Sequence, residues 1–459
     1  MNLPRITSRE PNPESDGVSI NVGGRIFQTT KQTLALAGSD SLLFRLAEST
    51  RFIDRDPELF SLLLSLLRTG NLPARSRAFD IRDLIDESRY YGIEAFLIDS
   101  LSNSSQFEAF NLQKSLVLPL NGRDSPSTIA AMANGGLHVA HGSKITSFDW
   151  SLRRKSTIPT AFSAVDSLLE ISPGIAAAGA TDYPGLQILD LKNGFVRHTL
   201  NWENPTRSSS TVQAIGSSNE YLFTSFESSR RTSNSIMVYD LASLMPVAEI
   251  DHREIYGSDI DSGIPSDKLS WIPSYNLLMA SGSHSSPSGV MGHIRFWDIR
   301  TRNMVWEIKE TLDCFSDVTV SDNLSAVFKV GVMSGEVFYT ELRSLGAEDP
   351  WIFIGDQRRS LNGKREGIGC KINSYGNNVF CSKGGDLELC SEVITALLGN
   401  AVRDVPDGRL FRKSLMGSSR DLGGNRISQL AFGGNRMFVT RKDSRCIEVW
   451  QSPGREISI

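Results

Sequence analysis

The pattern of hydrophobic and polar positions changes near residue 110, and this change predicts two domains. Before it, apolar residues recur three and four positions apart, as on amphipathic helices; after it, short strands are separated by Gly, Ser, Asn and Asp. We therefore expect a flexible N-terminus at 1–17, an α/β domain over 18–101, a linker over 102–111 and an all-β domain over 112–459.

The first domain is predicted to open with a β-hairpin. The segment 18–30, VSINVGGRIFQTT, alternates apolar and polar residues before the turn at Gly23-Gly24 and then resumes as a second strand. A further short strand is expected at Phe52-Ile53.

Three helices are expected after that strand. Asp56 suits the N-cap of the first, Pro57 its first helical position, and Gly70 its end. This helix carries two apolar stripes, so it must be nearly surrounded by other elements. The other two helices are predicted at about 81–91 and 93–101.

A repeat of about 50 residues organises the second domain. Seven times, an apolar strand ends on an aromatic or aliphatic residue that is followed by a more polar one, and a second apolar strand lies a short way upstream. The marker residues, which lie 41 to 61 positions apart, are Asp149, Asp190, Asp240, Asp298, Thr340, Cys390 and Gln451. A unit of this length with four short strands is typical of a propeller blade, so we expect a seven-bladed β-propeller.

The end of the sequence predicts how the ring closes. Only eight residues follow Gln451, too few for the outer strand of a seventh blade. The apolar run 115–120, just before the first blade, is placed to supply that strand. Such a closure ties the start of the propeller to its finish.

Charge and composition restrict the partners. The 48 Lys and Arg residues against 52 Asp and Glu give a net charge of −4, which predicts neither a nucleic-acid partner nor a membrane surface. The first eighteen residues lack the apolar core of a secretory signal, and no stretch is apolar enough for a membrane span. We expect a cytoplasmic or nuclear protein whose five cysteines are reduced thiols.

No motif predicts catalysis, a metal or a cofactor. The sequence has no GxSxG, HExxH, CxxC or GxGxxG pattern and no complete phosphate-binding loop. His138 and His141 are either a metal pair or, as we favour, structural or exposed side chains without a third ligand. Cys381 and Cys390 lie in adjacent predicted strands and are interpreted as buried, unreactive thiols.

Spaced motifs in the first domain resemble the BTB/POZ domain of the potassium-channel tetramerisation type. They are Val18-Ser-Ile-Asn-Val-Gly-Gly24, Phe27-x-Thr29-Thr30, Thr33-Leu34, Phe52-Ile-Asp-Arg-Asp-Pro57, Leu67-Arg-Thr-Gly70 and Glu87-x-x-Tyr90-Tyr-Gly92. The second domain resembles a degenerate WD-repeat propeller, with Trp297-Asp298 as the one strict pair. The combination is similar to plant BTB/POZ proteins, which are commonly regarded as substrate adaptors of cullin-3 ubiquitin ligases.

The resemblance implies a homo-oligomer, a tetramer or pentamer. The implied interface residues are Asn21, Gly23, Gly24, Asp54, Arg55, Asp56 and Arg68. Local roles remain open for several of them: the glycines and Asn21 as turn formers, Asp56 as a helix cap and Arg55 in a local ion pair. Some channel members of the family bind zinc through cysteines in this domain, but this chain has none before Cys314, so we expect no interfacial zinc.

Two further surfaces are predicted. Phe44, Leu46 and Tyr91 either form an apolar patch offered to cullin-3 or pack in the core. On the propeller, 227–235 and 281–292 are predicted to be long polar loops on one face, where Arg230, Arg231 and His284 are candidates for target binding. The alternative is that both loops are tolerated insertions.

These features predict a non-catalytic adaptor of a cullin-3 ubiquitin ligase. Its BTB domain is expected to oligomerise and bind cullin, and its propeller to bind an unknown target protein. The alternative is an oligomeric scaffold in signalling or transcription that does not bind cullin. An enzyme is the least supported class, because no constellation of catalytic residues was found.

Overall fold

The computed structural model separates the chain into two compact units, Met1–Asn103 and Ser104–Ile459. It describes residues 17–46, 52–203, 208–228, 233–254, 263–286, 289–311, 313–346, 350–355, 366–393, 409–417 and 424–452. Among these residues, no helix has the length and apolar character required to cross a membrane.

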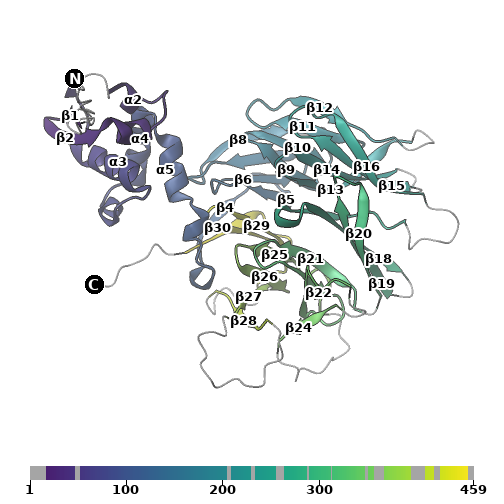
Figure 1. The fold of residues 1–459 in the computed structure, drawn as a ribbon. Coiled ribbons are helices and arrows are strands. Elements are labelled where there is room, and N and C mark those ends of the chain that lie inside the picture. The colour runs from purple at the N-terminus through teal and green to yellow at the C-terminus, as the bar shows by residue number, and fades with distance from the viewer. Residues whose placement is uncertain are drawn as a thin grey trace, which may run out of the picture. The chain divides into compact units, whose positions relative to one another are not determined.

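In its described residues, the first unit packs five α-helices beside a three-stranded sheet (Figure 1). The sheet order is β2-β1-β3, with β1 antiparallel to β2 and parallel to β3. The elements are β1 (Gly17–Val22), β2 (Arg25–Thr30), α1 (Lys31–Ala35), α2 (Leu42–Leu46), β3 (Phe52–Ile53), α3 (Pro57–Thr69), α4 (Ile81–Tyr91) and α5 (Glu94–Leu101). The predicted hairpin, short strand and three later helices are confirmed.

Helix α3 forms as its sequence requires. The Asp56 carboxylate accepts hydrogen bonds from the backbone N–H groups of Glu58 (2.7 Å) and Leu59 (3.3 Å), and Gly70 ends the helix in the left-handed conformation at φ 72°. Both apolar stripes of α3 are buried, so this helix is the centre of the first unit's core. The β1–β2 turn needs glycine at Gly23, where φ is 56° and a Cβ would lie 2.6 Å from the Arg55 carbonyl oxygen.

The described part of the second unit is a ring of seven four-stranded antiparallel sheets, so the predicted propeller is confirmed (Figure 1). Blades 1 to 3 are β5 (Pro126–Ala131), β6 (Leu137–His141), β7 (Lys144–Phe148) and β8 (Arg154–Pro159); β9 (Ser167–Ser172), β10 (Ile175–Gly179), β11 (Leu186–Asp190) and β12 (Val196–Leu200); and β13 (Ser210–Ser217), β14 (Tyr221–Ser228), β15 (Ser233–Asp240) and β16 (Pro246–Glu254).

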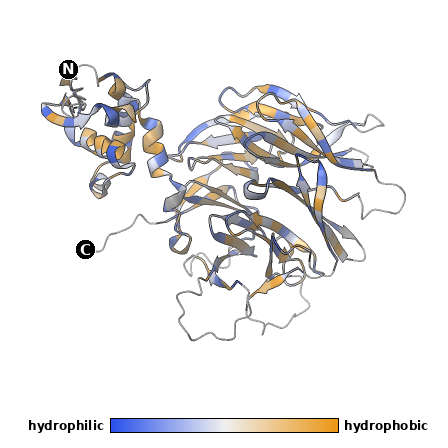
Figure 2. Ribbon diagram, viewed as in Figure 1, coloured by the Kyte–Doolittle hydropathy of each residue, from blue (hydrophilic) through white to orange (hydrophobic). Residues whose placement is uncertain are grey.

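Blades 4 to 7 repeat the same order from inner to outer strand. They are β17 (Lys268–Ile272), β18 (Leu277–Ser286), β19 (Gly289–Asp298) and β20 (Asn303–Glu310); β21 (Phe315–Ser321), β22 (Ala326–Gly331), β23 (Val337–Glu341) and β24 (Ile352–Ile354); β25 (Ile372–Tyr375), β26 (Asn378–Lys383), β27 (Asp386–Glu392) and β28 (Phe411–Leu415); and β29 (Ile427–Gly433), β30 (Arg436–Arg441), β31 (Cys446–Gln451) and β4 (Gln113–Pro119). Figure 2 shows hydrophobic residues recurring along these strands and along the helices of the first unit.

The ring closes with a strand from its own beginning, as predicted. β4 pairs antiparallel with β31, in a register that sets Leu116 against Val449 and Leu118 against Ile447. Leu118 is buried in the cluster between blades 7 and 1, whereas Leu116 is 44% exposed. The last blade therefore has its outer strand from a segment more than three hundred residues away in sequence.

The predicted linker is wrong for most of its length, because residues 104–111 pack on the propeller. The Phe107 ring lies 4.8 Å from the Tyr375 ring and 5.9 Å from the Phe380 ring, measured between centroids. Glu108 exchanges two hydrogen bonds of 3.1 Å with the Ser452 hydroxyl, and Ala109 is buried. The segment begins with polar, serine-rich residues, and for this reason the packing of Phe107 on the propeller was not predicted.

The two predicted polar loops of the propeller are paired strands in all of their described residues, while 229–232 and 287–288 lie outside the described ranges. In blade 3, β14 runs to Ser228 and β15 begins at Ser233. In blade 4, β18 runs to Ser286 and β19 begins at Gly289, and His284 pairs with Met291. A β-ladder joins backbone groups and does not require apolar side chains, so serine-rich strands can extend past the core. Among the described residues, the blade 4 strand pair projects past β17 and β20, whereas the blade 3 pair ends level with β13 and β16.

We expect Leu118→Ala to lower the free energy of unfolding by about 2–4 kcal/mol, because it empties a buried position in the strand that closes the ring. Leu116→Ala, on the same strand but exposed, should change it by less than about 0.5 kcal/mol. Urea unfolding of the full chain measures both. Equal losses in the two variants would contradict the closure.

Candidate interaction surfaces and the propeller channel

The outer face of the N-terminal sheet carries an exposed apolar strip around Asn21. Asn21 pairs in register with Ile26 on β2 and with Phe52 on β3, so the three side chains share one face. Ile26 is 66% exposed and Phe52 is 62% exposed. The Asn21 amide oxygen is itself buried and has no hydrogen-bond partner among the described residues. Ile26 and Phe52 were not predicted as site residues. The sequence signal that could have identified them is their position on the outward face of strands whose other apolar residues point inward.

Arg55 is placed for the local ion pair that was one of its two predicted roles. Its guanidinium lies over the Tyr90 ring, 4.1 Å from the centroid, and 3.5 Å from the Glu87 carboxylate. Burial raises the pKa of Glu87, and the charge of Arg55 opposes that rise. The Arg55 side chain remains 41% exposed, so the contact leaves part of its surface accessible.

The other charged interface candidates have mainly local contacts. Asp56 caps α3, and Arg68 donates a 2.5 Å hydrogen bond to the Gln28 carbonyl. Asp54 is exposed, and Gly23 and Gly24 form the β1–β2 turn.

Two of the three residues predicted to meet cullin are buried in the first unit. Leu46 is 4% exposed, and Tyr91 is fully buried with its ring 5.1 Å from the Phe60 ring. The apolar patch is therefore wrong for both, and core packing is their role. Phe44 is 39% exposed and is the one member that presents surface.

The two candidate histidines of blade 1 are held by neighbouring side chains. His138 Nδ1 lies 2.9 Å from the Ser147 hydroxyl and its Nε2 lies 3.5 Å from Glu170; His141 Nε2 lies 2.8 Å from the Thr146 hydroxyl. Burial lowers the pKa of His141. No group of three potential metal ligands occurs within the described ranges. The favoured structural interpretation of both histidines agrees with these contacts.

All five cysteines carry free thiols, and four are buried. Burial raises the pKa of Cys314 and of Cys390 to about 12, so both stay protonated and poorly nucleophilic at neutral pH. The predicted target-binding residues Arg230 and Arg231 lie outside the described residues. His284 is exposed on β18, in the projecting part of the blade 4 hairpin.

Polar side chains on the inner strands bind the next blade's backbone around the channel. Gln429 joins blade 7 to blade 1, accepting from the Ile129 N–H (2.9 Å) and donating to the Ser127 carbonyl (2.6 Å). Ser127 donates to the Val165 carbonyl beside blade 2 (2.6 Å), and Asn373 of blade 6 donates to the Leu430 carbonyl of blade 7 (3.2 Å). These bonds satisfy backbone groups along the channel and fix the inner strands to one another.

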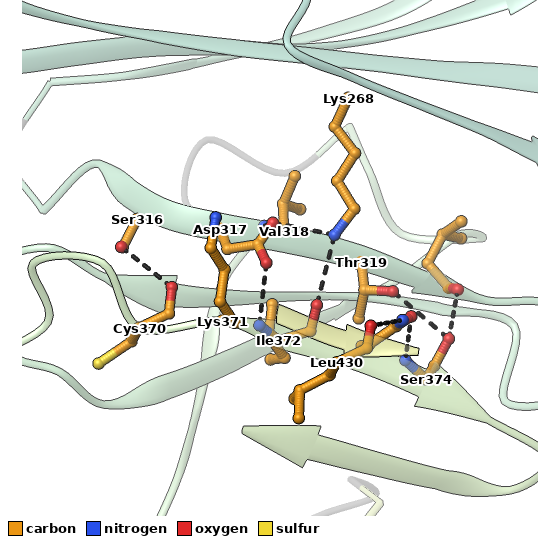
Figure 3. A network of polar contacts seen from close by, with 12 residues as sticks. Lys268, Ser316, Asp317, Val318, Thr319, Cys370, Lys371, Ile372, Ser374 and Leu430 are labelled. Carbon is orange, nitrogen blue, oxygen red and sulfur yellow. Dashed lines mark hydrogen bonds and ion pairs between the residues drawn. The ribbon is translucent and has the colours of Figure 1, made fainter. Parts of the chain in front are cut away.

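A charged pair among these contacts joins three blades (Figure 3). Lys268 Nζ at the start of β17 lies 2.9 Å from Asp317 Oδ1 on β21 and 3.3 Å from the Ile372 carbonyl on β25. The other Asp317 oxygen accepts the Ile372 N–H at 3.0 Å, and its Oδ1 also accepts the Val318 N–H at 2.9 Å. Lys268 and Asp317 therefore form a closed pair that pins blades 4, 5 and 6 together.

A cavity of about 320 Å³ lies beside this pair at the mouth of the channel. Its polar lining includes Asp267, Lys268, Ser281, Asp317 and Lys371. The Asp267 side chain is open to the channel, yet protein surrounds it on most sides, and this burial together with the Asp317 charge raises its pKa to about 6. No periodic signal in the sequence marks this site. The one clue was a charged residue directly before several inner strands, namely Asp166, Asp267, Lys371 and Arg426.

Comparisons with known proteins match both units. Residues 18–101 match the BTB/POZ domain family, and residues 121–346 match the At2g24240-like C-terminal beta propeller. The chain is 74% identical to the Arabidopsis thaliana BTB/POZ domain-containing protein At5g41330, over the full length of both, and 26% identical to At4g30940 of the same plant over 95% of this chain and 98% of that one. BTB/POZ domain-containing protein KCTD9 of Mus musculus is 29% identical over 20% of this chain and 32% of its own length.

We expect Asp267→Asn to stabilise the protein at neutral pH. A carboxyl whose pKa is higher in the folded chain than the usual 3.8 disfavours folding when it is ionised, so the penalty exists above pH 6 and disappears below about pH 4. After allowance for screening by channel water, we expect Asp267→Asn to raise the free energy of unfolding by about 1 kcal/mol, which corresponds to about 2 °C in Tm.

Thermal melts of the full chain at about pH 7.5 and about pH 4.5 measure this difference. Asp166→Asn is the matched control, because Asp166 precedes the inner strand of blade 2 but its carboxylate accepts two hydrogen bonds from Thr181. That variant should gain nothing at either pH. A loss of stability in Asp267→Asn at pH 7.5 would show that the ionised carboxylate is well compensated.

Proposed function

Because this chain belongs to the plant family of BTB/POZ domain proteins that carry a C-terminal β-propeller, we propose that it is a substrate-recognition adaptor of a cullin-3 ubiquitin ligase. The two domains themselves support the general role of a protein-interaction adaptor. In the more specific proposal, the BTB domain clusters several copies and binds cullin, while the propeller holds the target protein.

The observation that carries self-association is the strip of Ile26, Asn21 and Phe52. Large apolar side chains on an open sheet face lower the free energy when a partner covers them, at about 25 cal/mol per Å² of apolar surface. A buried amide oxygen without a donor costs about 1–3 kcal/mol, which a donor from a second copy would recover. Exposed Arg55 and Asp54 nearby supply charged groups for the rim of such an interface.

Physically, an adaptor needs no catalytic group of its own. It holds the target close to the ligase, so that the target's lysines react at an effective concentration set by geometry. Several copies in one assembly present several propellers, which raises avidity for a target with repeated sites. Localisation in the cytoplasm or the nucleus fits this activity.

The second candidate is an oligomeric scaffold that does not bind cullin. The burial of Leu46 and Tyr91 favours it, because only Phe44 remains exposed from the apolar patch predicted to meet cullin. Both functions share the clustering module and the propeller, and they differ in one partner.

Self-association is tested by light scattering on the full chain. We expect a mass four or five times that of one chain, and dissociation by Ile26→Asp, which places an ionised carboxylate in a face that must lose water. Leu36→Asp is the control, since Leu36 is 59% exposed at the end of α1 and outside the sheet. A wild-type chain that stays monomeric at high concentration would refute the assembly.

Cullin binding is tested separately by titrating the full chain with the cullin-3 N-terminal domain. Binding at micromolar concentration is expected, with affinity reduced about tenfold in Phe44→Ala, which truncates an exposed aromatic anchor. Ile81→Ala, exposed at the start of α4, serves as the matched control. No binding by the wild type would remove the ligase adaptor and leave the scaffold.

A further inference from the structure

We propose that the channel mouth between blades 4 and 6 binds a cationic side chain, arginine or lysine, of the target polypeptide, with the Asp267 carboxylate as its anchor. This inference rests on the proposed function, in which the propeller holds a protein. It assigns the chemistry that the propeller recognises and the residue that recognises it.

The cavity is polar, open to the channel and of suitable size. Its volume of about 320 Å³ exceeds that of one long side chain, and acidic, basic, hydroxyl and amide side chains together make up most of its lining. It lies where the inner strands β17, β21 and β25 begin, because Lys268, Asp317 and Ile372 are at or near their first residues. An entering side chain would meet this ring of strand starts first.

The charged groups of the cavity are not equally available. Lys268 and Asp317 are committed to each other and to the backbone of blade 6, as Figure 3 shows. Asp267 has no cationic side chain within ion-pair distance among the described residues, and its carboxylate accepts a hydrogen bond from the Ser283 N–H. Asp267 is therefore the acceptor that a ligand can engage without breaking the contact that pins three blades.

The electrostatic balance at Asp267 favours a cation. Protein burial and the neighbouring Asp317 charge raise the pKa of Asp267 to about 6, although Lys371 and Lys268 act in the opposite direction. The ionised carboxylate thus lacks sufficient compensation in the unliganded protein. A guanidinium or ammonium group at hydrogen-bond distance would supply it.

Asp267 is continuous with the projecting hairpin of blade 4. Its backbone N–H donates to the Ser281 carbonyl on β18 at 2.8 Å, and Ser283 of the same strand donates to its carboxylate. The strand continues to the exposed His284 and turns back as β19. A target segment lying along this hairpin would have a side chain directed into the cavity at its base.

The test is a titration of the full chain with N-acetyl-arginine methylamide, in which ligand-observed NMR measures binding of this arginine probe. Saturable binding is expected at about pH 7.5, weakened about tenfold at about pH 5 because a protonated Asp267 no longer attracts a cation. The uncharged citrulline analogue and the acidic glutamate analogue should bind at least about tenfold more weakly.

Variants separate the anchor from the rest of the cavity. Asp267→Asn should abolish binding of the arginine probe, Asp166→Asn should leave it unchanged, and Lys371→Gln should strengthen it by removing a like charge. Melting curves verify that each variant is folded. Equal binding of the arginine probe to Asp267→Asn and wild type, or preferential binding of the glutamate probe that depends on Lys371, would overturn the proposal.

Failure of this inference is distinguishable from failure of the proposed function. If the chain oligomerises and binds cullin but shows no binding of the arginine probe that depends on Asp267, the cation site is wrong and the adaptor stands. If the probe binds through Asp267 but cullin does not bind, the cation site is retained and the protein is the scaffold of the second candidate function.

Discussion

Closure of the ring by β4 is the constraint on which the propeller depends. Each blade buries its faces against two neighbours, so a ring that opens at one point exposes two apolar faces at once. The ladder between β4 and β31 prevents this by making the last blade out of both ends of the domain. The aromatic anchor at Phe107, immediately before β4, holds the same segment against blades 6 and 7. The stretch that connects the two units is thus part of the closure.

The channel shows how a closed ring uses polar residues. Bonds from Ser127, Asn373 and Gln429 to neighbouring backbones satisfy inner-strand groups that would otherwise face a narrow channel. The Lys268–Asp317 pair adds a link across three blades. Once these groups are committed, Asp267 remains as an ionisable side chain in a confined polar cavity, and confinement is what gives it an unusual affinity for protons and, by our proposal, for cations.

Much of the fold could be predicted from the sequence because local rules decide it. The helix cap at Asp56, the helix end at Gly70 and the seven strand markers each depend only on residues close by in the sequence, and each prediction is confirmed. The failures concern information that is not local. Hydrophobicity alone does not distinguish the buried Tyr91 from the exposed Phe52, and serine-rich hairpins lack the alternation that marks a strand. The channel cluster was not predictable, since Lys268, Asp317 and Ile372 are 49 and 55 residues apart and meet only when the ring closes.

We propose complementary roles for the two units, in which the first provides a surface for clustering and the second provides a closed ring with a polar mouth. Native mass spectrometry of the full chain mixed with the cullin-3 N-terminal domain tests this division most directly. We expect one assembly that contains four or five copies of the chain together with bound cullin. A single chain without cullin at every protein concentration would contradict it.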